Sequence, residues 1–369
     1  MKSFKIVFIV NALHMQRCVK RIDEFADRGY EVEAYGFDRG VEVKKKPASC
    51  EITVIGSIDS STSYIKRLGT IKRGVKSVIV KHKNDQVIYY IFGLDNVMFY
   101  IIHSKRQPFI YEESDLVHTY MSSKVMRNLF EWIDKKSIRR ALLSVFTSEG
   151  FIKYHFGNSV PDNAFVIANR LPLSVRKLEV FKKDVTDMSH LSIGFVGFIR
   201  FKSIFNFAKV YCERFPEMEF HFFGTSNNEP DRVMFEPLKR YKNCFFHGVF
   251  SHPDELPNVY SQIDLVLSTY DVENENVRYA EPNKIYEAIY FETPIVVSSG
   301  TYLAEKVKRL GIGYDINAMD ENEIVEFVNG LTTESLQEKI ENARKIDKKE
   351  TLNINDDFFE KLENLLSRD

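Results

Sequence analysis

The chain has 369 residues, of which 44% are hydrophobic and 28% are charged, and its formal net charge at pH 7 is −1. This length suits two domains better than one compact core, and the composition is that of a globular protein rather than a disordered one. The net charge gives no indication of nucleic-acid binding, so we expect no nucleic-acid partner.

The cysteines and the apolar segments indicate a cytoplasmic protein. The four cysteines form no CxxC pair, which favours reduced thiols over a disulfide framework or a zinc site. The apolar start of the chain ends at Asn11 and no cleavage site follows, so a first strand explains it better than a signal peptide. The apolar segment 87–102 is interrupted by Asp95 and Asn96 and is too short to span a membrane.

The first half of the chain alternates short apolar runs with amphipathic segments. Lys5–Val10 predicts a buried strand, and residues 17–28 predict a helix that Gly29 ends. Further strands are predicted at 31–37, 51–56, 86–92, 109–114, 142–148 and 164–170, with helices near 96–103 and 123–140. Strands separated by helices indicate a parallel sheet that is covered on both faces.

Residues 171–190 lose this periodicity and gain charge, so we place a domain boundary there. The alternation then starts again, with strands predicted at 191–197, 219–224, 244–250, 264–269, 295–297 and 311–316 and helices at 202–216, 254–263 and 282–291. The expected fold is α/β, with two Rossmann-like, doubly wound parallel-sheet domains that face a central cleft. We predict domains at 1–172 and 188–350 and, at 351–369, a C-terminal helix that packs back on the first domain.

The segment 282–291 follows a loop at the carboxyl end of a predicted strand, where ligands bind in open parallel sheets. Pro282 suits the first helical position, and the unpaired N–H groups after it can bind a diphosphate. Asn283, Lys284 and Glu287 share one helical face, from which Glu287 can accept hydrogen bonds from two ribose hydroxyls. The alternative is an exposed Lys284–Glu287 pair that stabilises the helix by about 0.2–0.5 kcal/mol.

A second group of candidates follows the strand predicted at 191–197. Gly197 ends this strand, and Arg200 and Lys202 come directly after it. Two cations at the carboxyl end of a strand can neutralise a diphosphate bound to the 282–291 helix. The alternative is a solvated loop that carries two cations.

With these features together, the sequence resembles the GT-B glycosyltransferases, and in particular the retaining family 4 enzymes of bacterial polysaccharide biosynthesis. The resemblance is strongest from 191 to 299 and is carried by GFVGFIRFKSI, FHFFG, FFHGVF, DLVLST and EPNKIYEAIYFETPIVVS. It implies that Arg200 and Lys202 bind the donor diphosphate, that Glu287 binds the donor ribose, and that the loop at Glu281 and Pro282 meets the donor sugar. It also implies that His247 to Phe250, with Val249 among them, line the nucleobase pocket.

The sequence departs from the family pattern in three places. The spacing of Arg200 and Lys202 is tighter than usual, and NALHMQR stands where a glycine pair often follows the first strand. The third departure concerns a glutamate. A second glutamate often stands eight residues before the ribose glutamate, but Tyr279 stands there in this chain, and the nearest acid is Glu281. No Asp-x-Asp pair is present. We expect a metal-independent, retaining reaction that needs no cofactor beyond the nucleotide-sugar substrate, with Arg200, Lys202 and the helix start stabilising the departing diphosphate.

Residues near the acceptor are expected in the first domain. His14 follows the first strand and can act as a base or donate to the diphosphate, or it is a half-buried loop histidine. Glu112, Glu113 and Asp115 follow the apolar residues FIY at 109–111, and Glu113 is the acid we select. The alternative for Glu113 and Asp115 is a helix-capping role.

Residues 64–83 contain seven lysines and arginines and no acid, with Ile65, Leu68, Val75 and Ile79 near one helical face. Such a segment can rest on anionic lipid at the inner face of the plasma membrane and would suit an acceptor carried on a lipid diphosphate. The alternative is a solvated helix.

Three functions fit these observations. The first is a glycosyltransferase that passes a sugar from a nucleotide sugar to a glycan or lipid-linked acceptor. The second is a nucleotide-sugar epimerase or hydrolase of the same fold. The third is a non-catalytic sugar-nucleotide-binding subunit of a polysaccharide complex, which the missing glutamate at Tyr279 favours.

Overall fold

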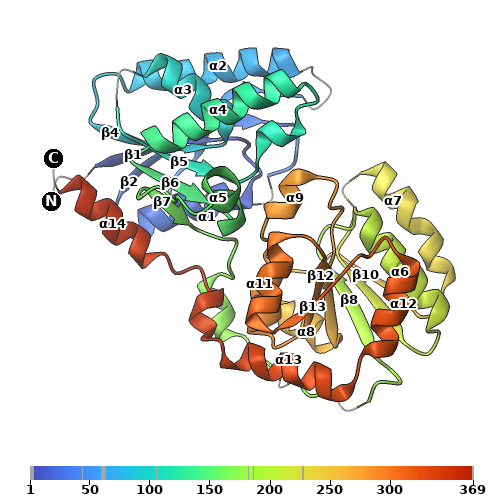
Figure 1. The fold of residues 1–369 in the computed structure, drawn as a ribbon. Helices are drawn as coiled ribbons and strands as arrows, with labels where there is room; N and C mark the ends of the chain where they lie inside the picture. The colour runs from blue at the N-terminus through green and yellow to red at the C-terminus, as the bar shows by residue number, and fades with distance from the viewer. Residues whose placement is uncertain are drawn as a thin grey trace. The chain divides into compact units, whose positions relative to one another are not determined.

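The computed structural model of the protein describes residues 4–43, 45–59, 64–104, 107–181, 183–185, 187–226 and 228–367, with the backbone alone at 64 and 65. The chain forms two compact units (Figure 1). Unit 1 consists of Met1–Ile167 with Asp357–Asp369, and unit 2 is Ala168–Asp356. Each unit is built around a parallel sheet with helices, which confirms the prediction of two doubly wound α/β domains.

The sheet of unit 1 has seven strands in the order β3-β2-β1-β4-β5-β6-β7, and all of them pair in parallel. Their bounds are β1 Lys5–Val10, β2 Glu31–Asp38, β3 Ile52–Ser57, β4 Val87–Phe92, β5 Phe109–Glu113, β6 Leu143–Phe146 and β7 Ala164–Val166. Every residue of β4 is buried, as expected for a strand with helices on both of its faces.

The helices of unit 1 cover both faces of its sheet. They are α1 Gln16–Asp27, α2 Tyr64–Lys81, α3 Leu94–His103, the 3₁₀ turn η1 Val117–Tyr120, α4 Lys124–Arg140, α5 Glu149–Phe156 and the C-terminal α14 Asp356–Leu366. Helices α2, α3 and α4 lie on one face of the sheet and α1 and α14 on the other (Figure 1). The last helix enters the core of unit 1, where the ring of Phe359 lies 4.8 Å from that of Phe25.

The sheet of unit 2 has six parallel strands in the order β10-β9-β8-β11-β12-β13. They are β8 Ser192–Val196, β9 Glu219–Phe223, β10 Cys244–Gly248, β11 Leu265–Ser268, β12 Ile295–Ser298 and β13 Gly313–Ile316. The strand order reverses between β8 and β11, and such a switch point is where open α/β sheets bind ligands, beyond the carboxyl ends of the strands.

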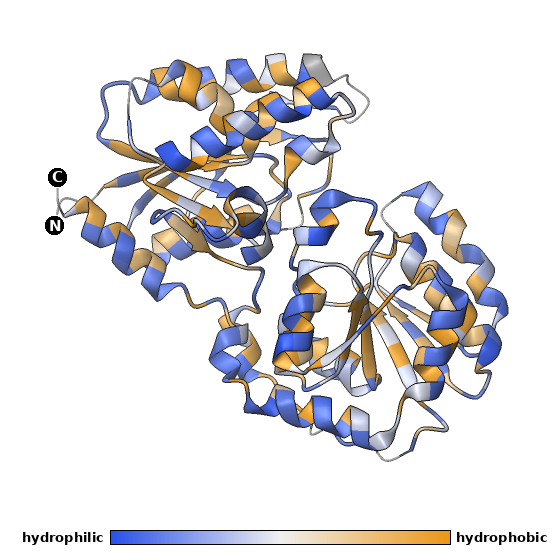
Figure 2. Ribbon diagram, in the orientation of Figure 1, coloured by the Kyte–Doolittle hydropathy of each residue, from blue (hydrophilic) through white to orange (hydrophobic). Residues whose placement is uncertain are grey.

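The helices of unit 2 connect these strands. They are η2 Leu173–Lys177, α6 Lys202–Arg214, α7 Glu229–Phe235, η3 Glu236–Arg240, α8 Leu256–Ser261, α9 Glu275–Tyr279, α10 Lys284–Tyr290, α11 Tyr302–Leu310, α12 Glu321–Gly330, α13 Thr333–Lys345 and η4 Lys348–Thr351. Figure 2 shows the strands as mostly hydrophobic, whereas the helices carry hydrophilic residues as well. This pattern is typical of a sheet buried between helices.

Two elements near the predicted site differ from expectation. The loop 270–281 contains helix α9, which the side chain of Asn274 caps by accepting a hydrogen bond from the Asn276 N–H. Helix α10 begins at Lys284 rather than at Pro282, because Asn283 is the residue that precedes its first full turn. The carbonyl of Pro282 accepts a 3.4 Å hydrogen bond from Ile285, so the proline belongs to the turn that leads into the helix.

Candidate functional site

The carboxyl ends of β8 and β9 meet at two glycines. The N–H of Gly197 donates a 2.8 Å hydrogen bond to the carbonyl of Phe223, and a Cβ on Gly224 would lie 1.9 Å from the carbonyl oxygen of Gly197. Both glycines have positive φ, 127° and 134°. Only glycine fits this backbone contact, which leaves the end of β8 without side chains that would cover it.

The ammonium group of Lys284 lies against this bare backbone. Its Nζ would be 3.1 Å from a Cβ on Gly197, and it lies 4.7 Å from the ring centroid of Phe195. Nζ also donates a 3.2 Å hydrogen bond to the hydroxyl of Tyr270, yet only 6% of the residue is exposed. Among the described residues, no carboxylate forms an ion pair with Lys284. The charge of Glu287 on the same helix interacts with Lys284 without a direct ion pair, and a ligand anion would supply a direct partner.

Glu287 lies one turn further along α10 and is 1% exposed. The hydroxyl of Tyr260 donates a 2.9 Å hydrogen bond to its Oε2, while Nε2 of His252 lies 3.3 Å from Oε1 and the amide of Asn283 also donates to Oε1. Burial acts to raise the pKa of Glu287, but the hydrogen bonds from His252 and Tyr260 and the charge of Lys284 outweigh it, so the pKa lies below its ordinary value. Glu287 is therefore a buried, ionised acceptor.

Arg200 is exposed and connects to Lys284 through two aromatic rings. Its guanidinium lies 4.7 Å from the ring centroid of Phe201, and Phe201 meets the ring of Tyr270 edge-on at 4.9 Å. The hydroxyl of Tyr270 in turn accepts the hydrogen bond from Nζ of Lys284. The structure thus brings two of the predicted cations, Arg200 and Lys284, to the same switch point.

Lys202 is the exposed first residue of α6, and the helix start that it occupies is already capped. The carboxylate of Asp271, from the loop after β11, accepts hydrogen bonds from the backbone N–H groups of Lys202 at 3.2 Å and Ser203 at 2.9 Å. A carboxylate at this position satisfies the first amides of the helix. The side chain of Lys202 remains available to a ligand, whereas these two N–H groups are already bonded to Asp271.

The loop acid Glu281 is part of the packing. Its Oε2 forms a 2.9 Å ion pair with Nζ of Lys306 of α11, and its Oε1 accepts a hydrogen bond from the hydroxyl of Tyr286. Glu281 is 4% exposed, so the contact with a donor sugar that we expected of it would require these bonds to break. Of the residues that follow it, Pro282 is half-buried and Asn283 is exposed.

The region expected to line a nucleobase pocket is an aromatic array at the edge of the sheet. His247 of β10 stacks on Phe223 with ring centroids 4.3 Å apart, and its Nε2 lies 3.0 Å from Nδ1 of His221. Burial lowers the pKa of His247, which is therefore neutral at pH 7. Val249, directly after β10, is 71% exposed.

The candidates of unit 1 differ in accessibility. His14 is half-buried in the turn after β1. Glu113 is 1% exposed, and both of its oxygens lie within 3.0 Å of Nε2 of His155. Burial, with the charge of Asp134, raises the pKa of Glu113 to about 8. The adjacent Glu112 is also buried and bonds to Arg21 and Tyr90, so neither glutamate is presented to a substrate as we expected.

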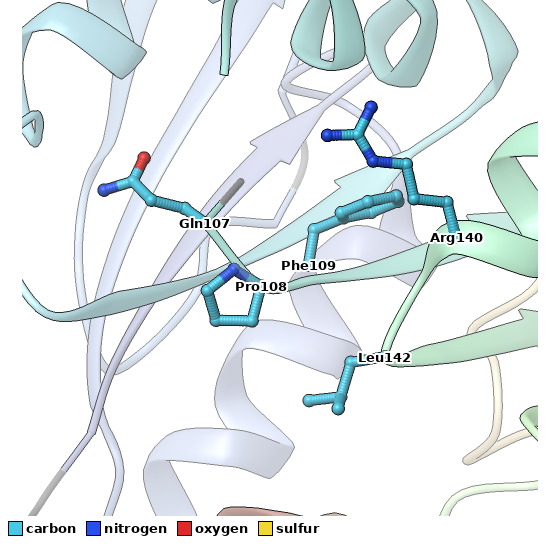
Figure 3. Close-up of a pocket in the computed structure, with 5 residues that line it drawn as sticks. All are labelled: Gln107, Pro108, Phe109, Arg140 and Leu142. Atoms are coloured by element: carbon cyan, nitrogen blue, oxygen red, sulfur yellow. The ribbon is translucent and has the colours of Figure 1, made fainter. Parts of the chain in front are cut away.

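A pocket of about 430 Å³ in unit 1 lies away from these residues (Figure 3). It is lined by Gln107, Pro108, Phe109, Arg140 and Leu142. Pro108 and Leu142 directly precede β5 and β6, so the pocket lies at the amino ends of parallel strands. Ligands of such sheets bind at the opposite edge, and we do not assign this pocket to the function.

Four residues of the site were not predicted: Tyr260, His252, Tyr270 and Asp271. Each of them lies in a different turn or helix from the site residue that it contacts. No local spacing in the sequence therefore links a residue of this group to its partner. The one available signal was position, since Tyr270 and Asp271 directly follow the strand predicted at 264–269.

Solved structures share this fold over nearly the whole chain. HepE of Anabaena in complex with UDP has 15% sequence identity, a TM-score of 0.68 and coverage of 98% of this chain and 100% of its own. Sucrose-phosphate synthase of Thermosynechococcus elongatus has 13% identity, a TM-score of 0.66 and coverage of 93% of each chain. A structure from Listeria monocytogenes described as a UDP-N-acetylglucosamine 2-epimerase has 12% identity, a TM-score of 0.55 and coverage of 92% and 91%.

No protein-family model matches the chain, and no curated protein matches its sequence. At these low identities the structural likeness establishes the fold alone. Two doubly wound parallel-sheet domains with this likeness give the chain the GT-B fold of glycosyltransferases.

Proposed function

We propose that the protein is a glycosyltransferase that moves a sugar from a nucleotide-sugar donor to a glycan or lipid-linked acceptor. The observation that carries this proposal is the buried ammonium of Lys284, which lies at the switch point of unit 2 without a direct ion pair to a carboxylate among the described residues. A donor diphosphate is an anion of the kind this position calls for. The fold agrees, since it is shared with sucrose-phosphate synthase and with a protein solved in complex with UDP.

The donor diphosphate would bind between Lys284 and Arg200. Lys284 supplies a fixed, desolvated charge beside the bare backbone of Gly197, and Arg200 supplies a solvated fork of N–H donors. As the bond between the anomeric carbon and the diphosphate oxygen breaks, negative charge grows on the diphosphate. Cations already in place stabilise that charge without reorganising.

Glu287 would bind the donor ribose. Tyr260 holds Oε2, and the ribose hydroxyls would replace Asn283 and His252 as donors to Oε1. His252 and Asn283 are both exposed, whereas Tyr260 is buried, so the two partners of Oε1 can move aside. The exposed Val249 and the stacked His247 are then the residues nearest the end of β10 for contact with the base.

We further propose a retaining reaction that resembles that of family 4 and uses no metal at the diphosphate. The acceptor hydroxyl oxygen bonds to the anomeric carbon on the face that the diphosphate leaves, and the leaving diphosphate takes the hydroxyl proton. This route needs no strong base from the protein, which agrees with the burial of Glu113. His14 stays a proposed donor to the diphosphate.

The acceptor proposed is lipid-linked and belongs to surface-polysaccharide biosynthesis at the inner face of the plasma membrane. None of the helices in the described residues combines the length and apolar content that a membrane span requires. Support for peripheral contact comes from α2, which has exposed cations at Lys66, Lys72, Arg73 and Lys76. Lys81 instead bonds to Glu33 and Tyr35, and the side chain of Ile65 lies outside the described residues.

Helix α4 adds an apolar stripe to the same face of the sheet (Figure 1). Val125, Leu129 and Trp132 are 77%, 46% and 58% exposed and stand three or four residues apart. Nζ of Lys136 lies 4.9 Å from the ring centroid of Trp132. Trp beside Lys is typical of a membrane interface.

Trp132→Ala and the Lys72→Glu/Lys76→Glu variant should each reduce sedimentation with anionic vesicles, whereas uncharged vesicles should bind neither variant nor wild type.

Turnover of a nucleotide sugar in the presence of an acceptor distinguishes the candidate functions. A thermal-shift screen with UDP, GDP, ADP and CMP identifies the base, because a ligand of the folded protein raises the melting temperature. The matching sugar nucleotide is then incubated with lipid-linked acceptors. A glycosylated acceptor supports the transferase. An isomerised sugar nucleotide without acceptor would favour the epimerase, which the likeness to the Listeria protein keeps as second candidate, and binding without any product would favour a scaffolding subunit.

A further inference from the structure

Unit 1 contains a cluster of four ionisable side chains that the proposed transfer reaction does not use. Glu113 ends β5, His118 lies in η1, Asp134 in α4 and His155 in α5. All four side chains are at most 1% exposed. Burying two carboxylates is costly unless their charge is balanced, so the cluster needs a partner cation or protons.

The contacts within the cluster leave polar atoms unsatisfied. Nε2 of His155 lies 2.9 Å from Oε1 of Glu113, and the hydroxyl of Tyr111 donates a 2.8 Å hydrogen bond to Oδ1 of Asp134. Oδ2 of Asp134, Nδ1 of His118 and Nδ1 of His155 have no hydrogen-bond partner, although each is buried. The first two of these atoms lie 3.6 Å apart. Buried polar atoms without partners are uncommon and call for a missing ligand.

The ligand atoms are close enough to share one ion. One ligand atom from each of Glu113, Asp134 and His155 can be chosen such that all three lie within 4.8 Å of one another. We propose that these three side chains bind one divalent transition-metal ion such as Zn²⁺, with the buried Nδ1 of His118 beside them, 3.6 Å from Oδ2 of Asp134. Two carboxylates and two neutral imidazoles carry two negative charges, which one divalent cation neutralises.

The surroundings match a closed structural site rather than a catalytic one. Full burial leaves no open coordination position for a substrate, so burial and not ligand type indicates a structural role, because structural zinc sites more often use cysteine. Outer-shell hydrogen bonds are also present, because Tyr111 fixes Asp134 and the hydroxyl of Tyr154 lies 3.2 Å from Nε2 of His118. The ion would tie β5, α4 and α5 together.

The test measures metal bound to the full-length protein, purified without chelators or a metal-affinity step. We expect one equivalent of zinc per chain by elemental analysis, a lower melting temperature after chelation, and recovery when Zn²⁺ but not Mg²⁺ is added back. Asp134→Asn and His155→Gln should lose the bound zinc. Glu112→Gln is the matched control: it removes a buried carboxylate that bonds to Arg21 and Tyr90 instead, and it should keep the zinc.

Several outcomes would overturn the proposal. Wild-type protein that takes up no stoichiometric Zn²⁺ and shows no shift in melting temperature would mean that protons balance the carboxylates, as imidazolium–carboxylate pairs. Zinc retained by a folded Asp134→Asn variant would place the metal elsewhere. If the variants do not fold, Co²⁺ titration of the wild type decides, because Co²⁺ in a tetrahedral protein site absorbs visible light strongly, whereas octahedral, hydrated Co²⁺ at a surface site absorbs weakly.

Discussion

The hydroxyl of Tyr260 donates a 2.9 Å hydrogen bond to Oε2 of Glu287, and both residues are buried. This bond joins α8 to α10 and fixes the carboxylate before any ligand arrives. Only Oε1, which faces the exposed Asn283 and His252, can exchange its partners. The carboxylate is therefore oriented in advance, and the free energy of ordering it is not taken from ligand binding.

Replacing Glu287 should weaken the donor complex. Glu287→Ala removes the acceptor for the ribose and should reduce the affinity for the nucleotide sugar by about 1–3 kcal/mol, the scale of hydrogen bonds to a charged group. Calorimetric titration measures this change. Glu281→Gln, which removes a buried carboxylate held by Lys306 and Tyr286, should lower stability more than affinity. Unchanged affinity in Glu287→Ala would refute the ribose assignment.

Glu287 should also contribute to stability in a pH-dependent manner. Burial raises its pKa, but hydrogen bonds and the charge of Lys284 more than compensate, so the folded pKa lies below the unfolded one. The unfolded state therefore takes up a proton first as the pH falls, and the contribution is present above about pH 4.3 and lost below it. Urea unfolding at a series of pH values should show a smaller loss of stability on acidification in Glu287→Gln than in the wild type. Parallel curves for the two proteins would contradict the lowered pKa.

Lys284→Met should weaken donor binding more than it changes the free protein. It removes a buried charge that has no direct ion pair among the described residues, but also a charge that helps to keep Glu287 ionised, so the melting temperature without ligand should change little. The same change should weaken nucleotide-sugar binding by about 2–5 kcal/mol, the range for one member of a buried charge pair. The exposed Lys308→Met of α11 is the control and should change neither quantity. Full donor affinity in Lys284→Met would show that Lys284 does not meet the diphosphate.

Arg200→Ala should lower turnover more than it lowers donor affinity. The arginine is exposed, so its contact with the ground-state diphosphate is screened by water, whereas charge on the diphosphate grows in the transition state. Steady-state kinetics with varied donor should therefore show a larger fall in kcat than rise in KM. A rise in KM with unchanged kcat would assign Arg200 to ground-state binding alone.

Phe359→Ala should destabilise unit 1 although the residue lies near the end of the chain. The ring is buried against Phe25, and the guanidinium of Arg28 lies 4.1 Å from its centroid. Loss of a buried Phe costs about 3–5 kcal/mol. Chemical denaturation should show this loss, whereas Leu129→Ala on the exposed side of α4 should change stability by less than about 0.5 kcal/mol.

Much of the fold follows from local patterns. Apolar runs such as Lys5–Val10 and 86–92, separated by amphipathic segments, predict parallel sheets because only helices can cover both faces of such strands. The strand ends then place Gly197, Arg200 and Lys284 at one edge. These inferences need only periodicity and chain direction, and the sheet orders agree with them.

The partners within the site could not be predicted in the same way. Glu281 meets Lys306, which is 25 residues away, and Asp271 caps a helix that begins 69 residues before it. Such pairs depend on how α11 and α6 pack on the sheet, which no short pattern encodes. Glu113 shows the reverse error: its position after a strand indicated a reactive acid, but the packing of α5 buries it against His155.

The packing of α14 into the core of unit 1 has a consequence for folding during synthesis. Residues 168–356 form the whole of unit 2 and leave the ribosome before α14 does. Until then, Phe25 and its neighbours on α1 lack the aromatic cover that Phe358 and Phe359 provide. The amino-terminal half, although translated first, is completed last, and its nascent form carries an open apolar surface throughout the synthesis of the second unit.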